Sequence, residues 1–210
     1  ITPPPFGCCI ETPSIQPLRL LFMHEQGRCL PSPALFYCRA DNHSLDHRLQ
    51  DFYAWTMSAQ LLIRPYAEND AAAVAMVHVS TWQQTYQGIM DPDLLAALDV
   101  QSYIRRWQEG YARYRDDPTR GTLVAVTNNE IFGFLSYGPA RDEGVSIPVE
   151  IYAINILKPY WGIGVGHTLF TSACSKLRAL RERQTYLWVL ADNHRARDAY
   201  MRWGGSCDAG

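Results

Sequence analysis

Three glycines at alternating positions, Gly162, Gly164 and Gly166, have the spacing in this chain that is most informative about chemistry. They follow the apolar segment 151–157, which has a strand-like pattern, and they precede apolar residues at helical spacing. A strand, a glycine turn and a helix start together direct backbone N–H groups and the positive end of a helix at an anion. Glycine suits such a turn because it lacks a Cβ and accepts a positive φ. The stretch therefore predicts a phosphate-binding loop.

Two common phosphate-binding loops do not fit the spacing. The dinucleotide pattern G-x-G-x-x-G, counted from Gly162, requires a third glycine at position 167, where the chain has His167. A P-loop requires Gly-Lys-Ser/Thr, but Gly166 is followed by His167 and Thr168. A glycine turn that only connects a strand to a helix remains an alternative.

The pattern resembles motif A of the GCN5-related N-acetyltransferases, in which Arg or Gln, two residues, Gly, one residue, and Gly or Ala wrap the pyrophosphate of coenzyme A. Trp161, Gly164 and Gly166 match it, and Trp161 stands where the family has Arg or Gln. The resemblance covers about residues 60–205 and implies acetyl-CoA as the cosubstrate, with no metal. The residues that it places against coenzyme A are Ile156, Leu157, Trp161, Gly162, Ile163, Gly164, Val165, Gly166, His167 and Asn193.

Acetyl transfer to an amine requires that the amine lose a proton and that the departing thiolate be protonated or stabilised. The resemblance places a general base at Glu150, at the head of the strand; the alternative is an exposed carboxylate at a strand end. Tyr200 lies seven residues after Asn193 on the last predicted helix, where the family has a general acid near the sulfur. The alternative for Tyr200 is packing of that helix on the sheet.

The acceptor side is predicted from an aromatic pair near the end of the first predicted helix of the domain. Trp82, Tyr86 and Gly88 form W-x-x-x-Y-x-G. Residues at i and i+4 share a helix face. The resemblance places Trp82, Tyr86 and Tyr152 beside the acceptor amine, and core packing is the alternative for the pair. His78 and His167 are isolated and are not expected to be catalytic.

Composition excludes several other classes of protein. A net charge of −2 gives no electrostatic argument for nucleic acid. No apolar run reaches the roughly 20 residues of a membrane span, and the N-terminal region lacks the pattern of a signal peptide. The six cysteines contain no C-x-x-C pair and so do not support a zinc site. We expect a soluble, cytoplasmic protein without nucleic-acid or membrane partners; a homodimer is left open.

Residues 1–56 differ from the rest of the chain. They hold seven of the thirteen prolines and show no sustained helical or strand period. Met57 precedes a segment that resembles the beginning of a domain. We therefore expect an irregular extension over residues 1–56, dispensable and without a catalytic role, and an acetyltransferase domain over residues 57–210.

The predicted elements alternate in the order of the acetyltransferase family. They imply an α/β (α+β) fold of the acyl-CoA N-acyltransferase type, with a mixed, mostly antiparallel sheet flanked by helices. Strands are expected at 60–64, 122–127, 131–137, 148–157 and 185–190, and helices at about 70–85, 91–98, 99–114, 164–181 and 193–203. Few residues follow Gly204, so the usual C-terminal strands are expected to be missing, which would leave an open sheet edge at strand 185–190.

These observations favour an N-acetyltransferase that transfers an acetyl group from acetyl-CoA to a primary amine of a small molecule or peptide. The alternative is a non-catalytic acyl-CoA-binding module, favoured by Trp161 and by the short C-terminus. A nucleotide-binding domain is disfavoured by the spacing of the loop.

Overall fold

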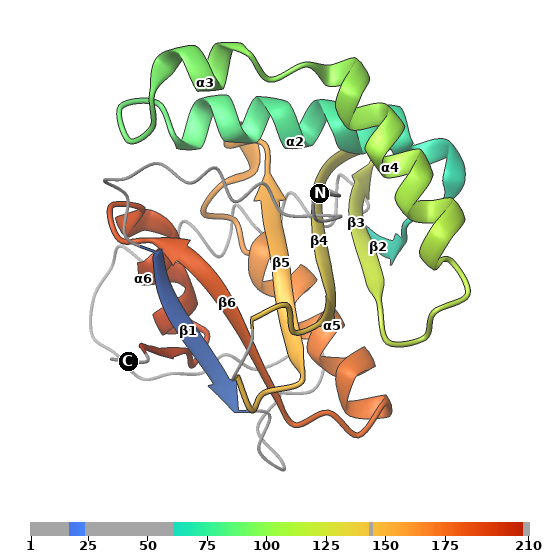
Figure 1. Cartoon of the computed structure of the whole chain (residues 1–210), viewed down its shortest axis with the longest axis vertical. Helices are drawn as coiled ribbons and strands as arrows, with labels where there is room; N and C mark the ends of the chain where they lie inside the picture. Colours follow the sequence, from blue (N-terminus) through green and yellow to red (C-terminus); the bar gives the residue numbers. More distant parts are fainter. Residues whose placement is uncertain (1–16, 24–60, 143–144, 208–210) are drawn as a thin grey trace.

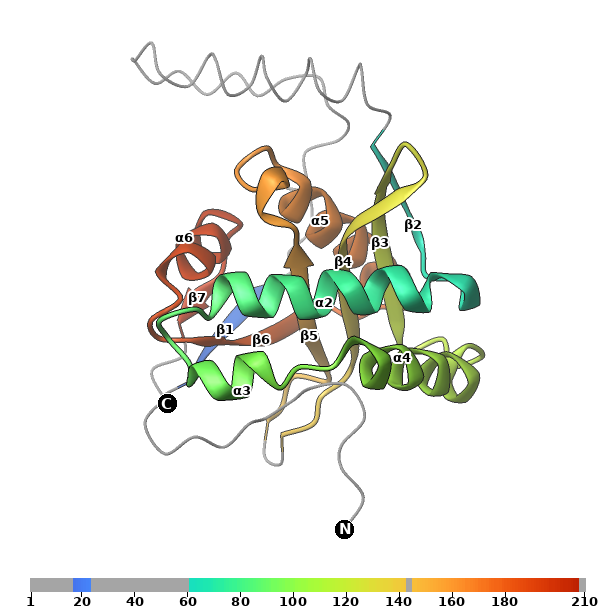
Figure 2. The same ribbon diagram turned by 90° about the horizontal axis from the view of Figure 1, so that it is seen from above.

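The computed structural model describes residues 17–23, 61–142 and 145–207. Helices cover both faces of one sheet, so that the described part of the chain has three layers (Figures 1 and 2). Helices α2, α3 and α4 lie on one face, and α5 and α6 lie on the other. The helix bounds are Glu68–Asp70 (η1), Ala71–Thr85 (α2), Pro92–Ala96 (α3), Val100–Tyr114 (α4), Lys158–Tyr160 (η2), Val165–Ala179 (α5) and His194–Arg202 (α6).

The sheet has the strand order β2-β3-β4-β5-β6-β1-β7. All neighbouring strands are antiparallel except β5 and β6, which are parallel. This is the mixed, mostly antiparallel sheet flanked by helices that the sequence predicts. The strand bounds are Pro17–Met23 (β1), Leu62–Pro65 (β2), Gly121–Thr127 (β3), Glu130–Pro139 (β4), Val149–Ile156 (β5), Gln184–Leu190 (β6) and Ser206–Cys207 (β7).

Local sequence explains several of these bounds. Asn128 and Asn129 join β3 to β4 with φ angles of 48° and 64°. A two-residue hairpin turn of type I′ requires positive φ at both central positions, and asparagine tolerates it well. Asp99 caps α4, because its carboxylate accepts hydrogen bonds from the N–H groups of Gln101 and Ser102.

Each face of the sheet has its own apolar core. On one face, α5 packs Leu169, Ala173 and Leu177 against β3, β4 and β5. Cys174, which the sequence places on the same apolar stripe, is buried there. On the other face, α2 and α4 pack around Phe134 of β4. The two cores fix the helices on opposite faces of β5, the strand that leads into the glycine loop.

The structure corrects two expectations about the ends of the chain. Pro17–Met23 lies within the extension that was predicted to be irregular, yet it forms β1. This strand pairs with β6 over seven register positions, from Pro17 opposite Leu190 to Met23 opposite Gln184. The edge of β6 expected to be open is therefore covered by a segment distant in sequence, and β7 adds a short pairing beyond it. The rest of the extension lies outside the described residues.

Candidate active site

The site begins where β5 and β6 separate. Their parallel pairing consists of two register positions, Glu150 opposite Tyr186 and Ile151 opposite Leu187. At the same point the pairing of β5 with β4, on its other edge, is irregular. Ser136 pairs with Ala153, whereas the next residue, Tyr137, pairs with Ile151. Tyr152 is skipped, as in a β-bulge, which bends the strand and leaves the extra residue outside the regular ladder. The bulge and the separation together open a V-shaped gap in the sheet.

A cavity of about 690 Å³ occupies this gap. Ligand sites for small molecules commonly have volumes of roughly 300–1,000 Å³. Most of the site residues predicted from the sequence line the cavity, namely Trp82, Tyr86, Tyr152, Ile156, Trp161, Gly162, Ile163, Gly164, Val165, Gly166, His167, Asn193 and Tyr200. Leu157 and Glu150 do not line it. Leu157 lies next to the lining, where its N–H donates to the carbonyl of Phe132 at 2.9 Å.

The glycine loop has the geometry of an anion cradle. Gly162 and Gly164 have φ angles of 81° and 90°, in the left-handed region. A Cβ built at Gly162 would meet nothing within 4 Å, so the space beside that residue is open. Gly164 is the N-cap of α5, whose 15 residues begin at Val165. The loop and the helix start thus provide backbone N–H groups and a positive helix end, which suit a phosphate group.

Trp161 and Arg195 form a contact across the cavity. The guanidinium carbon of Arg195 lies 3.4 Å from the centroid of the Trp161 ring, a cation–π geometry. The indole N–H of Trp161 donates to the carbonyl of Ile156 at 2.5 Å. Partial burial lowers the pKa of Arg195 from its usual value, yet an arginine remains charged at neutral pH. A cation from α6 therefore lies beside the position at which the family has Arg or Gln.

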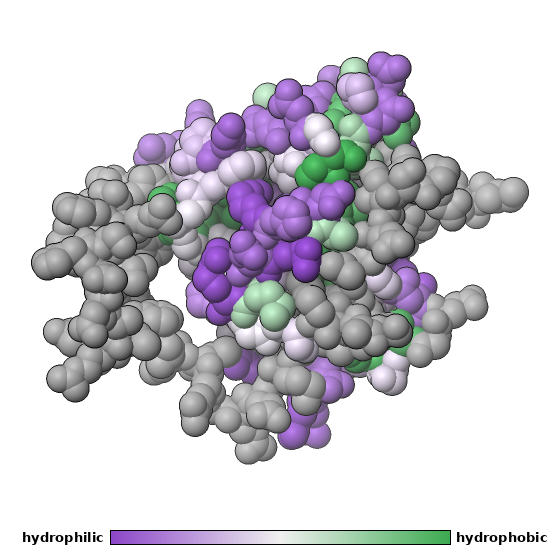
Figure 3. Space-filling view, turned by 90° about the vertical axis from the view of Figure 1, so that its left-hand side faces the viewer, coloured by the Kyte–Doolittle hydropathy of each residue, from purple (hydrophilic) through white to green (hydrophobic). Residues whose placement is uncertain are grey.

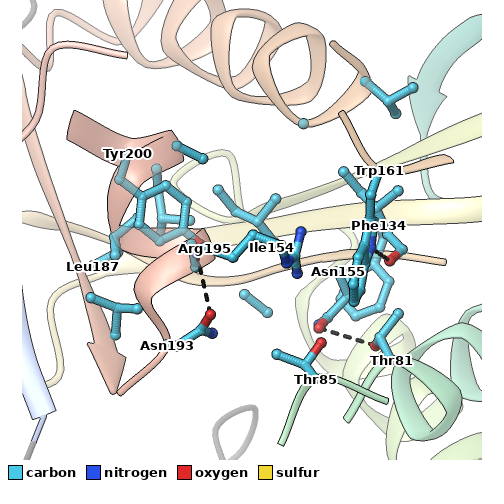
Figure 4. Close-up of a pocket in the computed structure, with 18 of the residues that line it drawn as sticks. Thr81, Thr85, Phe134, Ile154, Asn155, Trp161, Leu187, Asn193, Arg195 and Tyr200 are labelled. Carbon is cyan, nitrogen blue, oxygen red and sulfur yellow. Dashed lines mark hydrogen bonds between the residues drawn. The ribbon is translucent and has the colours of Figure 1, made fainter. Parts of the chain in front are cut away.

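Tyr200, Asn193 and Tyr86 come together on the α6 side. Asn193 is buried and caps α6, its side-chain oxygen accepting from the N–H of Ala196 at 3.2 Å. The same side chain hydrogen-bonds the hydroxyl of Tyr86. Burial raises the pKa of Tyr200 well above its ordinary value, so its hydroxyl is protonated at neutral pH. Tyr200 lines the cavity from α6, so the arrangement places a protonated phenol at its wall (Figure 4).

The acceptor side of the cavity is lined with aromatic rings. Trp82 and Tyr86 of α2 lie 5.2 Å apart in an edge-to-face arrangement. His78 lies one helical turn before Trp82, and its ring contacts those of Trp107 and Phe134. Burial lowers the pKa of His78 to about 3, so the imidazole is neutral.

The structure places Glu150 neither at an exposed strand end nor in the lining of the cavity. Its side chain is 1% exposed, lies outside the cavity lining and pairs with Arg141, whose Nε donates to Oε2 at 2.9 Å and whose Nη2 contacts Oε1. Both carboxylate oxygens are thus engaged by the guanidinium of Arg141, and paired charge-assisted hydrogen bonds of this kind fix the orientation of the side chain. We therefore assign Glu150 to the ion pair that joins β5 to the segment after β4. The sequence could not reveal this, because Arg141 lies beyond the end of β4.

Several residues of the site were not found from the sequence. Arg195 lies two residues after Asn193 and points toward Trp161 from the first turn of α6 (Figure 4). Thr81 and Asn155 are in contact at 3.1 Å across the gap between α2 and β5. Phe134 and Trp107 complete the aromatic wall from β4 and α4. The only available signal was the position of Arg195, because a cation in the first turn of a helix is unfavourable unless an anion is nearby.

The outer surface beside the site is polar. Arg195 and Arg202 of α6 are both exposed and also line the cavity. Figure 3 shows the side of the molecule at the left of Figure 1, where hydrophilic residues predominate among those that are coloured. None of the helices in the described part of the chain is long and apolar enough to cross a lipid bilayer.

Comparison with known proteins gives one consistent result. A sequence model of the acetyltransferase (GNAT) family matches residues 82–205. An uncharacterized N-acetyltransferase, YuaI of Bacillus subtilis, is 28% identical over 132 residues, which are 62% of this chain and 72% of that protein.

Solved structures show the same fold. The N-acetyltransferase PaiA of Thermoplasma acidophilum, in complex with coenzyme A, aligns with a TM-score of 0.60 at 17% identity, covering 68% of this chain and 87% of that one. The ribosomal-protein-alanine N-acetyltransferase of Brucella melitensis aligns with a TM-score of 0.53 at 22% identity, and the alignment covers 68% of this chain and 83% of that one. The matched region contains the glycine loop, Tyr86 and Tyr200. The chain therefore belongs to the acetyltransferase (GNAT) family.

Proposed function

We propose that this protein is an acetyl-CoA-dependent N-acetyltransferase that acetylates a primary amine of a small molecule or peptide. One observation carries the proposal: the glycine loop, the separation of β5 from β6 and the Tyr200 hydroxyl all border one cavity. The loop suits the phosphates of coenzyme A, the unpaired strand edge suits its pantetheine arm, and the hydroxyl can protonate the departing thiolate. The family of the chain and the coenzyme A complex of a structural neighbour support this assignment.

The residues present fit coenzyme A. The pyrophosphate would lie against the N–H groups of the loop at 161–167 and the start of α5, with Arg195 as the nearby cation. The pantetheine arm would follow the edge of β5 beyond Ile151, where β6 no longer pairs with it. The acceptor amine would enter from the side of Trp82 and Tyr152.

In the proposed reaction the amine nitrogen bonds to the acetyl carbon and the carbon–sulfur bond breaks; the nitrogen loses one proton to solvent water, and the sulfur takes up one proton. Tyr200 would donate that proton, because its hydroxyl is protonated and lines the cavity. Tyr86, held by Asn193, would position the acceptor beside it.

The test is calorimetry of coenzyme A with Gly164→Asp, compared with Gly88→Asp. Both glycines have positive φ, 90° and 79°, so each substitution carries a similar backbone cost. Only Gly164 lies in the cavity lining, where an added carboxylate would oppose the phosphates. We expect Gly164→Asp to abolish binding and Gly88→Asp to retain it. Equal binding by the two variants would refute the loop assignment.

A non-catalytic acyl-CoA-binding module is the second candidate function. The engagement of Glu150 by Arg141 favours it, because the carboxylate expected to act as the base is paired with a guanidinium and does not line the cavity. Coenzyme A binding without turnover of any amine in a broad panel would establish this candidate. Turnover of any primary amine that depends on acetyl-CoA would exclude it.

A further inference from the structure

The acceptor half of the cavity has a chemical character that restricts its substrate. This inference rests on the proposed function and concerns which amines that site accepts. Aromatic rings form the wall: His78 lies 5.7 Å from Trp82 and 5.5 Å from Phe134 between ring centroids. Trp107 packs against Phe134 at 5.1 Å. Such a wall favours an apolar or aromatic body.

The charges that act on this half of the cavity are positive. Arg195 of α6 lines the cavity beside Trp161, and Arg106 of α4 lies outside the lining but close enough to help lower the pKa of His78. His78 itself is neutral, and the Tyr86 hydroxyl of α2 and the Tyr152 hydroxyl of β5 are protonated, because burial raises the pKa of each. Among the described residues that line the cavity there is no Asp or Glu. A protonated ammonium group is repelled here, whereas a neutral amine is not.

The number of hydrogens available around the Thr81 hydroxyl identifies the atom that accepts a hydrogen bond from the amine. The Thr81 hydroxyl oxygen lies 2.7 Å from the carbonyl of Val77, 2.9 Å from that of His78 and 3.1 Å from the side-chain amide of Asn155. A hydroxyl has one hydrogen, and carbonyl oxygens only accept. A threonine within a helix commonly donates to the carbonyl four residues earlier, which is the shortest of these contacts.

It follows that the amide N–H of Asn155 donates to Thr81. The oxygen and nitrogen of an amide have nearly the same shape, so the hydrogen-bond network decides their positions. The structure draws Oδ1 of Asn155 toward Thr81 (Figure 4), so this assignment exchanges the oxygen and nitrogen of the amide. Nδ2 then lies toward Thr81, and Oδ1 faces the cavity that Asn155 lines. This oxygen is a neutral acceptor at the edge of β5, two residues beyond Ala153 and the bulge.

We propose that the acceptor is a primary monoamine with one aromatic or apolar body, bound as the neutral amine with an N–H donating to Oδ1 of Asn155. The rings of α2, α4 and β4 enclose the body. Polyamines and amino sugars, which carry further ammonium groups, are excluded by the positive charges and by the apolar wall.

The experiment compares two sets of primary amines with the full-length protein and acetyl-CoA. One set has aromatic or apolar monoamines such as 2-phenylethylamine; the other has polyamines such as 1,4-diaminobutane. We expect kcat/KM to be about tenfold to a hundredfold higher for the monoamines, the range for burying one large apolar side group. Equal or better turnover of the polyamines would overturn the proposal. If neither set is acetylated although coenzyme A binds, the proposed function itself fails.

Two variants test the residues that carry the proposal. Asn155→Asp places a carboxylate where the neutral oxygen lies, and we expect it to shift the ratio of kcat/KM at least about tenfold toward the diamine. Trp82→Ala should raise KM for the aromatic amine and leave that for the diamine unchanged. Met76→Ala is the matched control, because Met76 lies on α2 with 60% exposure and does not line the cavity.

Coenzyme A affinity close to that of the unmodified protein shows that each variant is folded. An unchanged substrate ratio in folded Asn155→Asp would show that this side chain does not face the amine, and would overturn the proposal.

Discussion

The two edges of strand β6 behave in opposite ways. Toward β1 the strand pairs at seven register positions, whereas toward β5 it pairs at two. The paired edge is part of a continuous sheet, and the unpaired edge opens into the cavity. A strand edge without a partner exposes N–H and C=O groups, which a ligand can use. We infer from this contrast that β6 can separate from β5 on one edge because its other edge is paired with β1.

The largest effect is expected on the open side, at Tyr200. Tyr200→Phe removes the proposed proton donor, and kcat should fall on the order of 10²-fold, equivalent to about 2.7 kcal/mol. The ring still packs against Trp203, so coenzyme A affinity should be retained. Tyr137→Phe is the control: it removes a buried hydroxyl that does not line the cavity, and its kcat should match that of the unmodified protein. Steady-state kinetics with a good acceptor decides; a normal kcat would leave Tyr200 with a packing role only.

On the closed side, Leu20→Pro breaks the pairing of β1. Leu20 pairs with Leu187 on one edge and with Cys207 on the other. Proline removes a backbone donor and is disfavoured inside a sheet. We expect the free energy of unfolding to fall by about 2 kcal/mol, measured by denaturant titration.

The same substitution at Leu62 provides the control for β1. Leu62 begins β2, an edge strand, where proline is tolerated. If Leu20→Pro lowers stability no more than Leu62→Pro does, β1 does not stabilise the sheet. The contrast between the two edges of β6 would then disappear.

The pH dependence of stability tests whether the aromatic wall of the cavity depends on a neutral imidazole at His78. Its pKa is about 3 in the folded chain and ordinarily 6.5, so between these values the unfolded chain binds a proton that the folded chain does not. Stability should therefore be complete above pH 6.5 and fall as the pH decreases below it, by at most about 1.4 kcal/mol per pH unit. His78→Phe keeps a ring at this position and should flatten the dependence between pH 4.5 and 6.5. Parallel curves for the two proteins would contradict the assignment.

The smallest effect is expected at Trp161, which follows η2 in the loop after β5. Trp161→Phe removes the N–H that donates to Ile156 and should cost about 1 kcal/mol of stability or less. It also frees the Ile156 carbonyl for the pantetheine arm, so coenzyme A should bind equally or up to about tenfold more tightly. Calorimetry measures this, and tenfold weaker binding would show that the indole itself contacts the ligand.

Local sequence determined most of the elements from β2 to α6 and the glycine loop between β5 and α5. Strand and helix periodicity, the two asparagines of the β3–β4 turn and the glycines at 162, 164 and 166 are local signals. They report on backbone conformations that depend on neighbouring residues. Asn193 and Tyr200, which the resemblance to the family places at the site, both line the cavity.

Tertiary structure decided what depends on contacts between distant segments. Glu150 is an ion-pair partner because Arg141 reaches it, and β6 is covered because Pro17–Met23 pairs with it. The charge beside the glycine loop comes from Arg195, more than thirty residues after the position at which the family has Arg or Gln. Spacing along the chain predicts which groups share a helix face or a strand, but only packing determines which groups from different elements meet.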